Sequence, residues 1–216
     1  MSREITITID DKKIRTVEGK ILLWVALAND IYIPHLCAIE GKDLPEASCR
    51  LCFVEIEGKN KPVTSCTQPV YDGMVVRTRT AKVDRLVKTA FELLLSDHRL
   101  GCASCPKNRN CELQRIAKER KLKLRHTRFK YLGRETAVDD SPDSFSFDPS
   151  RCVLCGQCIW ADHEKAKVGA IGFARRGLGR TVATFNYESL KDSPCTECGL
   201  CVEACPVGAL SFKKNT

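Results

Sequence analysis

Alternating apolar and polar residues fill the start of the chain, where residues 3–18 hold two such runs on either side of a polar turn. Alternation with a period of two on both sides of a turn predicts a β-hairpin. The apolar run that follows predicts a short amphipathic helix at roughly 20–30. A further alternating run, a turn at Gly58 and another extended run predict a second strand pair within 52–66. Strand, strand, helix and further strands together predict a small mixed sheet that grasps one helix.

Helical spacing replaces this alternation in the middle of the chain, where apolar residues recur along 81–98. The spacing predicts a longer helix that ends at a cysteine-rich loop, and the helical pattern resumes after Cys111. Residues 133–146 are rich in Ser, Asp and Pro, which predicts a linker. The final segment, 147–216, contains two similar cysteine-rich units, which indicates an internal duplication of roughly forty residues.

The cysteine content points to order that does not come from apolar packing alone. The chain has 216 residues and 14 cysteines, and only 6% of its residues are aromatic. Its start lacks the apolar core of a secretion signal, and its longest apolar run, 21–28, is too short to span a bilayer. We therefore expect a cytoplasmic protein, in which thiols stay reduced and bind metal in preference to forming disulfides.

The first cysteine set is a C-x2-C pair with two flanking cysteines: Cys37, Cys49, Cys52 and Cys66. Four thiolates in this arrangement suit a [2Fe-2S] cluster of the plant type with a longer first gap. Zinc is the alternative, because four cysteines also satisfy a tetrahedral site. The preceding hairpin and helix favour iron.

The second set is a histidine followed by three cysteines in one short loop: His98, Cys102, Cys105 and Cys111. A lone histidine near a helix end is more often a surface or capping group than a ligand. Here no spare cysteine remains to complete four ligands, and imidazole is known to replace thiolate at cluster iron. We therefore predict that His98 is the fourth ligand of a [4Fe-4S] cluster.

The third and fourth sets lie in the duplicated units, as Cys152, Cys155 and Cys158, and as Cys195, Cys198, Cys201 and Cys205. In two-cluster ferredoxins the fourth cysteine of each run binds the other cluster. This crossing predicts that Cys205 completes a [4Fe-4S] cluster with the first three cysteines. The cluster of the second unit then faces position 162, where Asp162 stands in place of a cysteine.

Asp162 leaves the last corner of the second cluster open to three alternatives. They are a carboxylate ligand from Asp162, an imidazole ligand from His163, and an empty corner that makes a three-iron cluster, in that order of preference. A carboxylate oxygen is a harder ligand that holds cluster iron less well than thiolate does. Asp162 as an ordinary surface residue in a displaced loop is the remaining alternative. The four sets use all 14 cysteines without a remainder.

These motifs resemble the iron-sulfur region shared by the large iron-sulfur subunit of respiratory complex I, the N-terminal part of [FeFe] hydrogenases and the small diaphorase subunit of NAD-reducing [NiFe] hydrogenases. The matching segments cover nearly the full length and are 35–37, 49–58, 98–114, 152–158 and 198–210. Asp162 departs from the family pattern. The chain is also expected to lack the hydrogenase active-site domain and the large molybdopterin-type domain.

The resemblance implies an α+β fold of three domains. They are a β-grasp [2Fe-2S] ferredoxin domain at 1–80, a small helical [4Fe-4S] domain with one His and three Cys ligands at 81–132, and, after the linker, a bacterial-type two-cluster ferredoxin-like domain at 147–216. The implied cofactors are one [2Fe-2S] cluster and three [4Fe-4S] clusters, of which one is either Asp-ligated or [3Fe-4S].

No substrate site is evident in the sequence. The glycine cluster at 175–181 lacks the strand-to-helix context and the third glycine of a dinucleotide-binding loop. Redox cofactors without a catalytic site predict an electron-transfer subunit that is not an enzyme by itself. The resemblance implies that it relays single electrons between a flavin-containing NAD(P)H dehydrogenase subunit and a catalytic subunit such as a hydrogenase, in a hetero-oligomeric complex without a membrane span. A formate dehydrogenase or a flavin-based electron-bifurcating complex is the alternative setting.

A net charge of +8 and the basic run at 117–134 suggest nucleic-acid binding as the alternative from a different class. The run follows a helical pattern with few aromatic residues, which is typical of a solvated helix face. Cluster-bound thiolates also carry negative charge that the formal count leaves out. A redox-sensing regulatory protein of this class would show salt-dependent affinity for nucleic acid.

Overall fold

The computed structural model describes residues 3–133 and 137–213. It divides into two compact units, which meet in the chain between Phe91 and Glu92. In the described ranges no helix combines the length and the apolar character that crossing a membrane requires.

The first unit is built on a mixed five-stranded sheet with the strand order β2-β1-β5-β3-β4. Its elements are β1 (Glu4–Ile9), β2 (Lys12–Val17), α1 (Leu22–Leu27), β3 (Phe53–Ile56), β4 (Val63–Thr64) and β5 (Val75–Arg77). β1 pairs with β5 in parallel, and the other neighbouring strands are antiparallel. The predicted hairpin and the second strand pair are therefore both confirmed.

The hairpin turn depends on two consecutive aspartates in the left-handed region. Asp10 and Asp11 have φ angles of 45° and 68°, as a two-residue turn matched to the strand twist requires. The Asp10 carboxylate also accepts a 2.8 Å hydrogen bond from the backbone N–H of Thr78, just after β5. The turn thus fixes β1 against both of its neighbouring strands.

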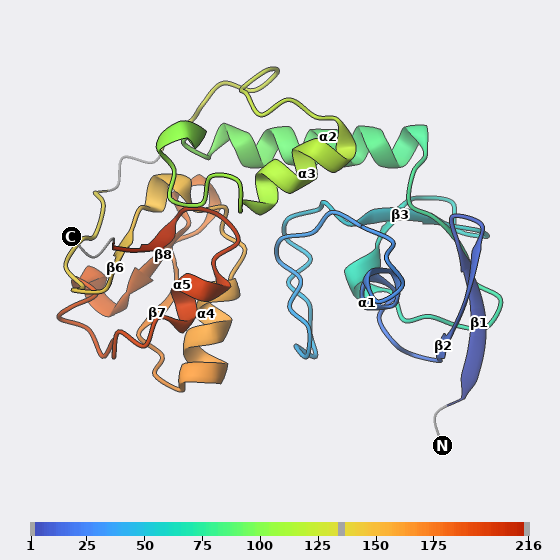
Figure 1. Ribbon diagram of the computed structural model, residues 1–216, viewed down its shortest axis with the longest axis horizontal. Coiled ribbons are helices and arrows are strands. Elements are labelled where there is room, and N and C mark those ends of the chain that lie inside the picture. The colour runs from blue at the N-terminus through green and yellow to red at the C-terminus, as the bar shows by residue number, and fades with distance from the viewer. Residues whose placement is uncertain (1–2, 134–136, 214–216) are drawn as a thin grey trace. The chain divides into compact units, whose positions relative to one another are not determined.

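The core of the first unit lies between the sheet and α1, which packs on one face of it (Figure 1). Ile5, Ile7 and Ile9 alternate inward along β1 and are all buried. α1 is shorter than the predicted helix at 20–30, because the chain turns into the left-handed region at Asp30, with a φ of 63°. Two cysteines, Cys52 and Cys66, belong to the same buried cluster.

Two longer helices come next in the chain: α2 (Ala81–Ser96) and α3 (Glu112–Arg120). α2 confirms the helix predicted from the spacing in 81–98. α3 ends where Lys121 takes a left-handed φ of 53° and its N–H bonds to the carbonyl of Lys118. The predicted helical face over 117–134 is therefore wrong for 121–133, and residue 134 lies outside the described residues.

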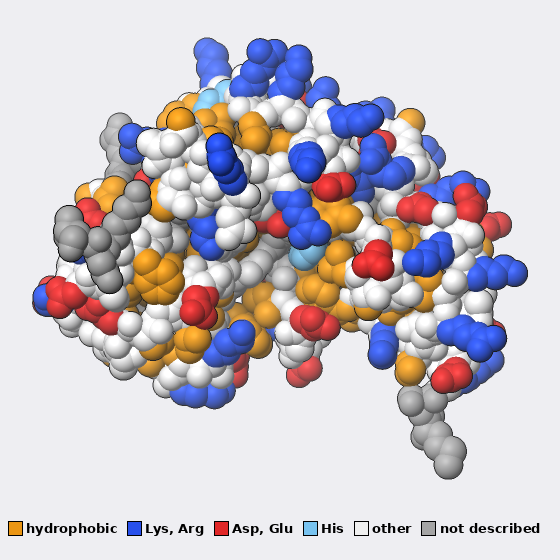
Figure 2. Space-filling view, in the orientation of Figure 1, with side chains coloured by type: hydrophobic (Ala, Val, Ile, Leu, Met, Phe, Trp, Pro, Cys, Tyr) orange, Lys and Arg blue, Asp and Glu red, His pale blue; other side chains and the backbone are white. Residues whose placement is uncertain are grey.

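The basic segment after α3 has no regular secondary structure in its described part. Its Lys and Arg side chains gather on the surface above α3 (Figure 2). Two contacts hold it near the end of α2. The His126 ring donates a 2.9 Å hydrogen bond to the Leu95 carbonyl, and the Arg128 guanidinium lies 3.1 Å from the Glu92 carboxylate. These contacts give the segment a structural role within the second unit.

The remainder of the second unit contains two antiparallel strand pairs and two short helices. They are β6 (Phe145–Phe147) with β9 (Leu210–Phe212), β7 (Ile171–Ala174) with β8 (Thr181–Thr184), α4 (Gln157–Trp160) and α5 (Leu200–Ala204). The glycine-rich segment 175–181 connects β7 and β8, so it joins two antiparallel strands and not a strand to a helix.

The predicted linker, 133–146, contains ordered contacts where it is described. β6 begins at its end, and the Asp139 carboxylate accepts a 2.8 Å hydrogen bond from the N–H of Leu190. Residues 134–136 of this linker lie outside the described residues. The α+β class is confirmed, whereas the individual domain boundaries stay predictions.

Candidate metal centres

All 14 cysteines are free thiols, and most of them are buried or half-buried. The first set, Cys37, Cys49, Cys52 and Cys66, is wholly buried at the edge of the first unit's core. The N–H of Cys49 donates to the Cys37 sulfur over 3.4 Å, and the N–H of Ser65 donates to the Cys52 carbonyl over 2.9 Å. β3 and the short turn after β4 thus bring Cys52 and Cys66 together.

The thiols of this first set interact in two pairs. A hydrogen bond from Cys49 lowers the pKa of Cys37 to about 5, and the same bond raises the pKa of Cys49. A hydrogen bond from Cys66 likewise lowers the pKa of Cys52 to about 7, while the pKa of Cys66 rises. Burying four thiols together costs folding free energy unless they bind a metal or cluster. Thiolates are the form of cysteine that binds metal, so these four form a suitable donor set.

The second set surrounds one small cavity in the second unit. His98, Cys102, Cys105 and Cys111 all line it, together with Arg151 and Gly208. The His98 ring is buried, and its Nδ1 lies 2.8 Å from the Arg151 carbonyl. Burial lowers the pKa of His98, so the ring is neutral and its Nδ1–H donates to that carbonyl. The Nε2 lone pair is then available as a donor.

The third and fourth sets occupy two loops with the same backbone conformation. In the first loop the Leu154 N–H donates to the Cys152 sulfur over 3.4 Å, and in the second the Glu197 N–H donates to the Cys195 sulfur over 3.4 Å. Leu154 and Glu197 both have a φ of 53°, and a left-handed glycine follows two residues later in each loop. The predicted duplication is thus present in the local geometry.

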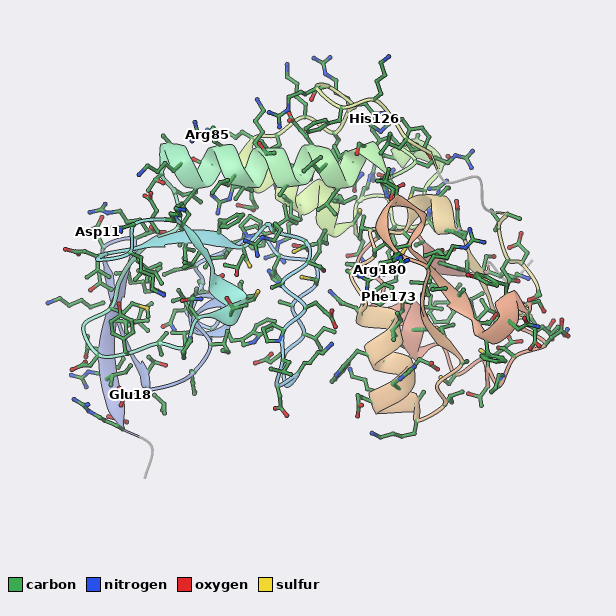
Figure 3. All side chains as sticks on the ribbon, turned by 180° about the vertical axis from the view of Figure 1, so that it is seen from behind. Asp11, Glu18, Arg85, His126, Phe173 and Arg180 are labelled. Atoms are coloured by element: carbon green, nitrogen blue, oxygen red, sulfur yellow. The ribbon has the colours of Figure 1, made fainter. Side chains whose placement is uncertain are left out.

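An aromatic ring packs on the left-handed glycine of each duplicated loop. A β-carbon on Gly156 would lie 3.4 Å from the Phe173 ring, and one on Gly199 would lie 2.9 Å from the Phe212 ring. The Arg180 guanidinium covers the Phe173 ring, with 3.7 Å between its central carbon and the ring centroid (Figure 3). Arg180 therefore covers the ring that packs against the first loop.

The thiols of the two loops lie close enough to shift one another's pKa values. The pKa of Cys158 is raised by burial and also by the negative charges of Cys152, Cys155, Cys205 and Cys201. Both Cys205 and Cys201 therefore lie near Cys158, and the assignment of Cys205 to the first loop stays a prediction. Burial raises the pKa of Cys201 to about 12, with further contributions from Cys195, Cys198 and Asp162.

Asp162 lies next to the second loop, because its charge also contributes to the raised pKa of Cys195. The residue is buried, in the π-helical segment Ala161–Ala166 that continues α4. One oxygen, Oδ2, accepts a 3.0 Å hydrogen bond from the Ile171 N–H. His163 is placed differently, because its side chain is 50% exposed and its Nε2 donates to the Ile171 carbonyl over 2.9 Å.

Sequence reasoning missed two residues at the second set, Arg151 and Gly208. Arg151 directly precedes Cys152, and nothing in the cysteine spacing indicates that its carbonyl meets a histidine 53 residues earlier. Gly208 follows Cys205 closely and sits against Cys105. Within the described ranges, His, Cys, Asp and Glu side chains do not converge in threes on one point, as a single metal ion would require.

Replacing Gly208 with alanine is expected to lower the iron bound at the second set by up to about four atoms per chain. A β-carbon at this position would lie 2.4 Å from the Cys105 sulfur, which would have to shift from its place. Native mass spectrometry of anaerobically purified protein measures the iron count. Gly172→Ala is the matched control, because its β-carbon would meet nothing within 4 Å. An unchanged iron count in Gly208→Ala would show that Cys105 need not hold this position.

Three protein families match consecutive parts of the chain. Residues 2–81 match the 2Fe-2S iron-sulfur cluster binding domain, and residues 88–126 match the NADH-ubiquinone oxidoreductase-G iron-sulfur binding region. Residues 144–211 match the ferredoxin-like domain of NADH-quinone oxidoreductase subunit 3. The chain thus contains domains that bind [2Fe-2S] and [4Fe-4S] clusters.

Similar curated proteins include subunits of several oxidoreductases. The chain is 38% identical to the NADP-reducing hydrogenase subunit HndD of Solidesulfovibrio fructosivorans, over 95% of this chain and 36% of that protein. It is 36% identical to the NADPH-Fe(3+) oxidoreductase subunit alpha of Geobacter sulfurreducens, over 97% of this chain and 24% of that protein. It is 32% identical to the NADH-ubiquinone oxidoreductase 78 kDa subunit of Neurospora crassa, over 97% of this chain and 28% of that protein.

The chain therefore spans about a quarter to a third of the length of these curated relatives. A solved structure is similar over a larger share of its length. It is a chain in the crystal structure of the NAD+-reducing [NiFe]-hydrogenase in the H2-reduced state, with a TM-score of 0.86 and 31% identity. The similarity covers 97% of this chain and 87% of that one.

Proposed function

The chain belongs to the family of iron-sulfur subunits and domains shared by complex I and NAD(P)-linked hydrogenases, and on this basis we propose that it relays single electrons. The observation that carries the proposal is the spacing of all 14 cysteines in four sets along the sequence, within three segments that match iron-sulfur domains. A cysteine count that leaves no remainder, in sets spaced as cluster ligands are, fits a protein whose main task is to hold clusters.

We assign one [2Fe-2S] and three [4Fe-4S] clusters to these sets. The first set, Cys37, Cys49, Cys52 and Cys66, holds the [2Fe-2S] cluster. The Nε2 of His98 joins Cys102, Cys105 and Cys111 at the second site. The third site takes Cys152, Cys155, Cys158 and Cys205. Bound clusters supply carriers that each accept one electron at a time, which is the chemistry a relay needs.

The fourth site joins Cys195, Cys198 and Cys201 with Asp162 in preference to His163. Asp162 is buried and close enough to raise the pKa of two of these thiols, in addition to the effect of their burial. The Nε2 of His163 is committed to the Ile171 carbonyl, and half of the side chain is exposed. Asp162 as the ligand leaves a harder oxygen donor at this one corner.

The residues around the sites support electron transfer without being ligands. Backbone N–H groups of Leu154 and Glu197 point at thiolate sulfurs, and such bonds stabilise the negative charge that a cluster gains on reduction. Burial of the first set excludes water from its thiolates. These features hold the donors in place for repeated oxidation and reduction.

The partners we propose are a flavin-containing NAD(P)H dehydrogenase subunit and a separate catalytic subunit such as a hydrogenase. Flavin suits the first position because it converts two-electron hydride transfer into the single electrons that clusters accept. Relatives named as an NADP-reducing hydrogenase subunit and an NADPH-Fe(3+) oxidoreductase subunit support an NAD(P)-linked complex. We place this complex in the cytoplasm, where free thiols stay reduced.

The iron count tests the assignment directly. One [2Fe-2S] cluster and three complete cubanes predict about fourteen irons per chain. Native mass spectrometry of anaerobically purified protein gives the count, and electron paramagnetic resonance detects any oxidised three-iron cluster. About thirteen irons with such a signal would indicate an open corner beside Asp162. About ten irons would contradict one of the three cubane sites.

A further inference from the structure

Arg151 is one of the residues that connect the second site with the loop of the third site. It directly precedes Cys152 and closes the short 3-10 turn Pro149–Arg151. Asp148 caps this turn, since its Oδ1 accepts a 3.0 Å hydrogen bond from the Ser150 N–H. The backbone at Arg151 is therefore fixed by the Asp148 cap before it and by the cysteine loop that begins directly after it.

The Arg151 carbonyl fixes the orientation of the His98 ring. It accepts the Nδ1–H of His98 over 2.8 Å, which leaves Nε2 facing the cavity that Cys102, Cys105 and Cys111 line. A second bond from the Arg99 N–H to the Ser150 carbonyl, at 2.8 Å, runs beside the first. Histidine ligands generally depend on a hydrogen bond at the other ring nitrogen for their orientation and their basicity.

The Arg151 side chain reaches the same site from another direction. Its guanidinium Nε lies 2.9 Å from the Asp148 carboxylate. The side chain also lines the same cavity as Cys105, and a β-carbon on Gly208 would lie 2.4 Å from the Cys105 sulfur and 3.8 Å from Cδ of Arg151. Both members of the Arg151 and Asp148 pair are mostly buried, with side-chain exposures of 12% and 16%. Burial lowers the pKa of Arg151, but the negative charges of Asp148 and Cys105 outweigh it and raise the pKa above its ordinary value.

We propose that Arg151 is a positioning residue that raises the reduction potential of the cluster at His98, Cys102, Cys105 and Cys111. The inference rests on the proposed function, because it takes that cluster as present. A permanent positive charge near a ligand sulfur stabilises the more negative reduced state of a cluster. The effect is stronger in a partly buried site than in water.

The test compares reduction potentials in four forms of the full chain: the parent, Arg151→Gln, Arg151→Lys and the control Arg109→Gln. Arg109 is an exposed arginine in the loop between Cys105 and Cys111. A redox titration followed by electron paramagnetic resonance gives each potential. The signal of the second site is identified by its change in a His98→Cys variant.

Arg151→Gln is expected to shift the potential of the second site to a more negative value while the iron count stays unchanged. Arg151→Lys is expected to shift it less in the same direction, because lysine keeps the charge but lacks the planar fork that reaches two acceptors. Arg109→Gln is expected to leave the potential in place. This order of potential shifts would show that the position of the Arg151 side chain matters, and not merely the loss of one positive charge from the chain.

An Arg151→Gln protein with full iron and the parent's potential would overturn the inference, and so would an equal shift in Arg109→Gln. If Arg151→Gln fails to bind the full complement of iron, Arg151→Lys decides, and the parent's potential in that variant overturns the inference. A parent that has about ten irons and no His98-dependent signal contradicts the proposed second site itself. The two failures are thus distinguishable.

Discussion

Replacing His98 with alanine is expected to remove the second cluster and to lower the iron count by about four per chain. The ring is buried and neutral, and its Nδ1–H is bound to the Arg151 carbonyl, so Nε2 is the nitrogen that faces the cavity. Alanine leaves three thiols and no fourth donor at that point. Native mass spectrometry measures the loss, and electron paramagnetic resonance identifies the signal that disappears.

His126→Ala is the matched control for this variant. The His126 ring lies in the same unit, donates to the Leu95 carbonyl over 2.9 Å and stacks on Tyr131 with 5.2 Å between ring centroids. Its loss would disturb local packing without removing a ligand, so the iron count should stay near that of the parent. Unchanged iron and unchanged spectra in His98→Ala would mean that His98 is an ordinary buried histidine.

Much of the fold follows from local patterns that the sequence carries in full. Alternation over 3–18 sufficed for the hairpin, since the two aspartates at its turn accept left-handed backbone. The repeated cysteine spacing predicted the duplicated loops, because three thiols at fixed intervals need the same left-handed residues in both copies. Short-range requirements of this kind leave few alternative conformations.

The residues that could not be predicted depend on contacts between distant parts of the chain. Arg151 meets His98 across 53 residues, and Gly208 meets Cys105 across a gap about twice as long. No local periodicity encodes such pairs, so single-sequence reasoning proposes ligands from their spacing and misses the groups around them. The helix predicted over the basic run was wrong for another reason. The left-handed Lys121 ends α3, although the charge pattern of a helix continues beyond it.

Position 162 shows how the duplicated units diverged. Cys195 follows Cys152 by 43 residues, and Cys205 follows Asp162 by the same 43 residues, so Asp162 is the counterpart of Cys205. In the second unit Pro206 directly follows the cysteine and ends the helix. In the first unit the helix continues through Asp162 as a π-helical segment, a feature often found at functional sites.

Asp162→Cys is expected to slow iron loss from the fourth cluster by about tenfold, the lower end of the effect of changes around metal sites. Asp162 is buried beside Cys195 and Cys201, so a thiolate there would replace a harder oxygen donor with one better suited to cluster iron. The rate is measured as the decay of iron bound per chain after a chelator is added under anaerobic conditions.

Two further variants decide whether the carboxylate acts as a ligand or only as a hydrogen-bond acceptor. Asp162→Asn keeps an oxygen that can accept the Ile171 N–H but lacks the negative charge, so iron loss should become faster than in the parent. His163→Cys moves the thiol to the half-exposed neighbouring position and should give no protection. Equal rates in the parent, Asp162→Cys and Asp162→Asn would mean that position 162 does not contact the cluster, whereas protection by His163→Cys alone would move the ligand to the next residue.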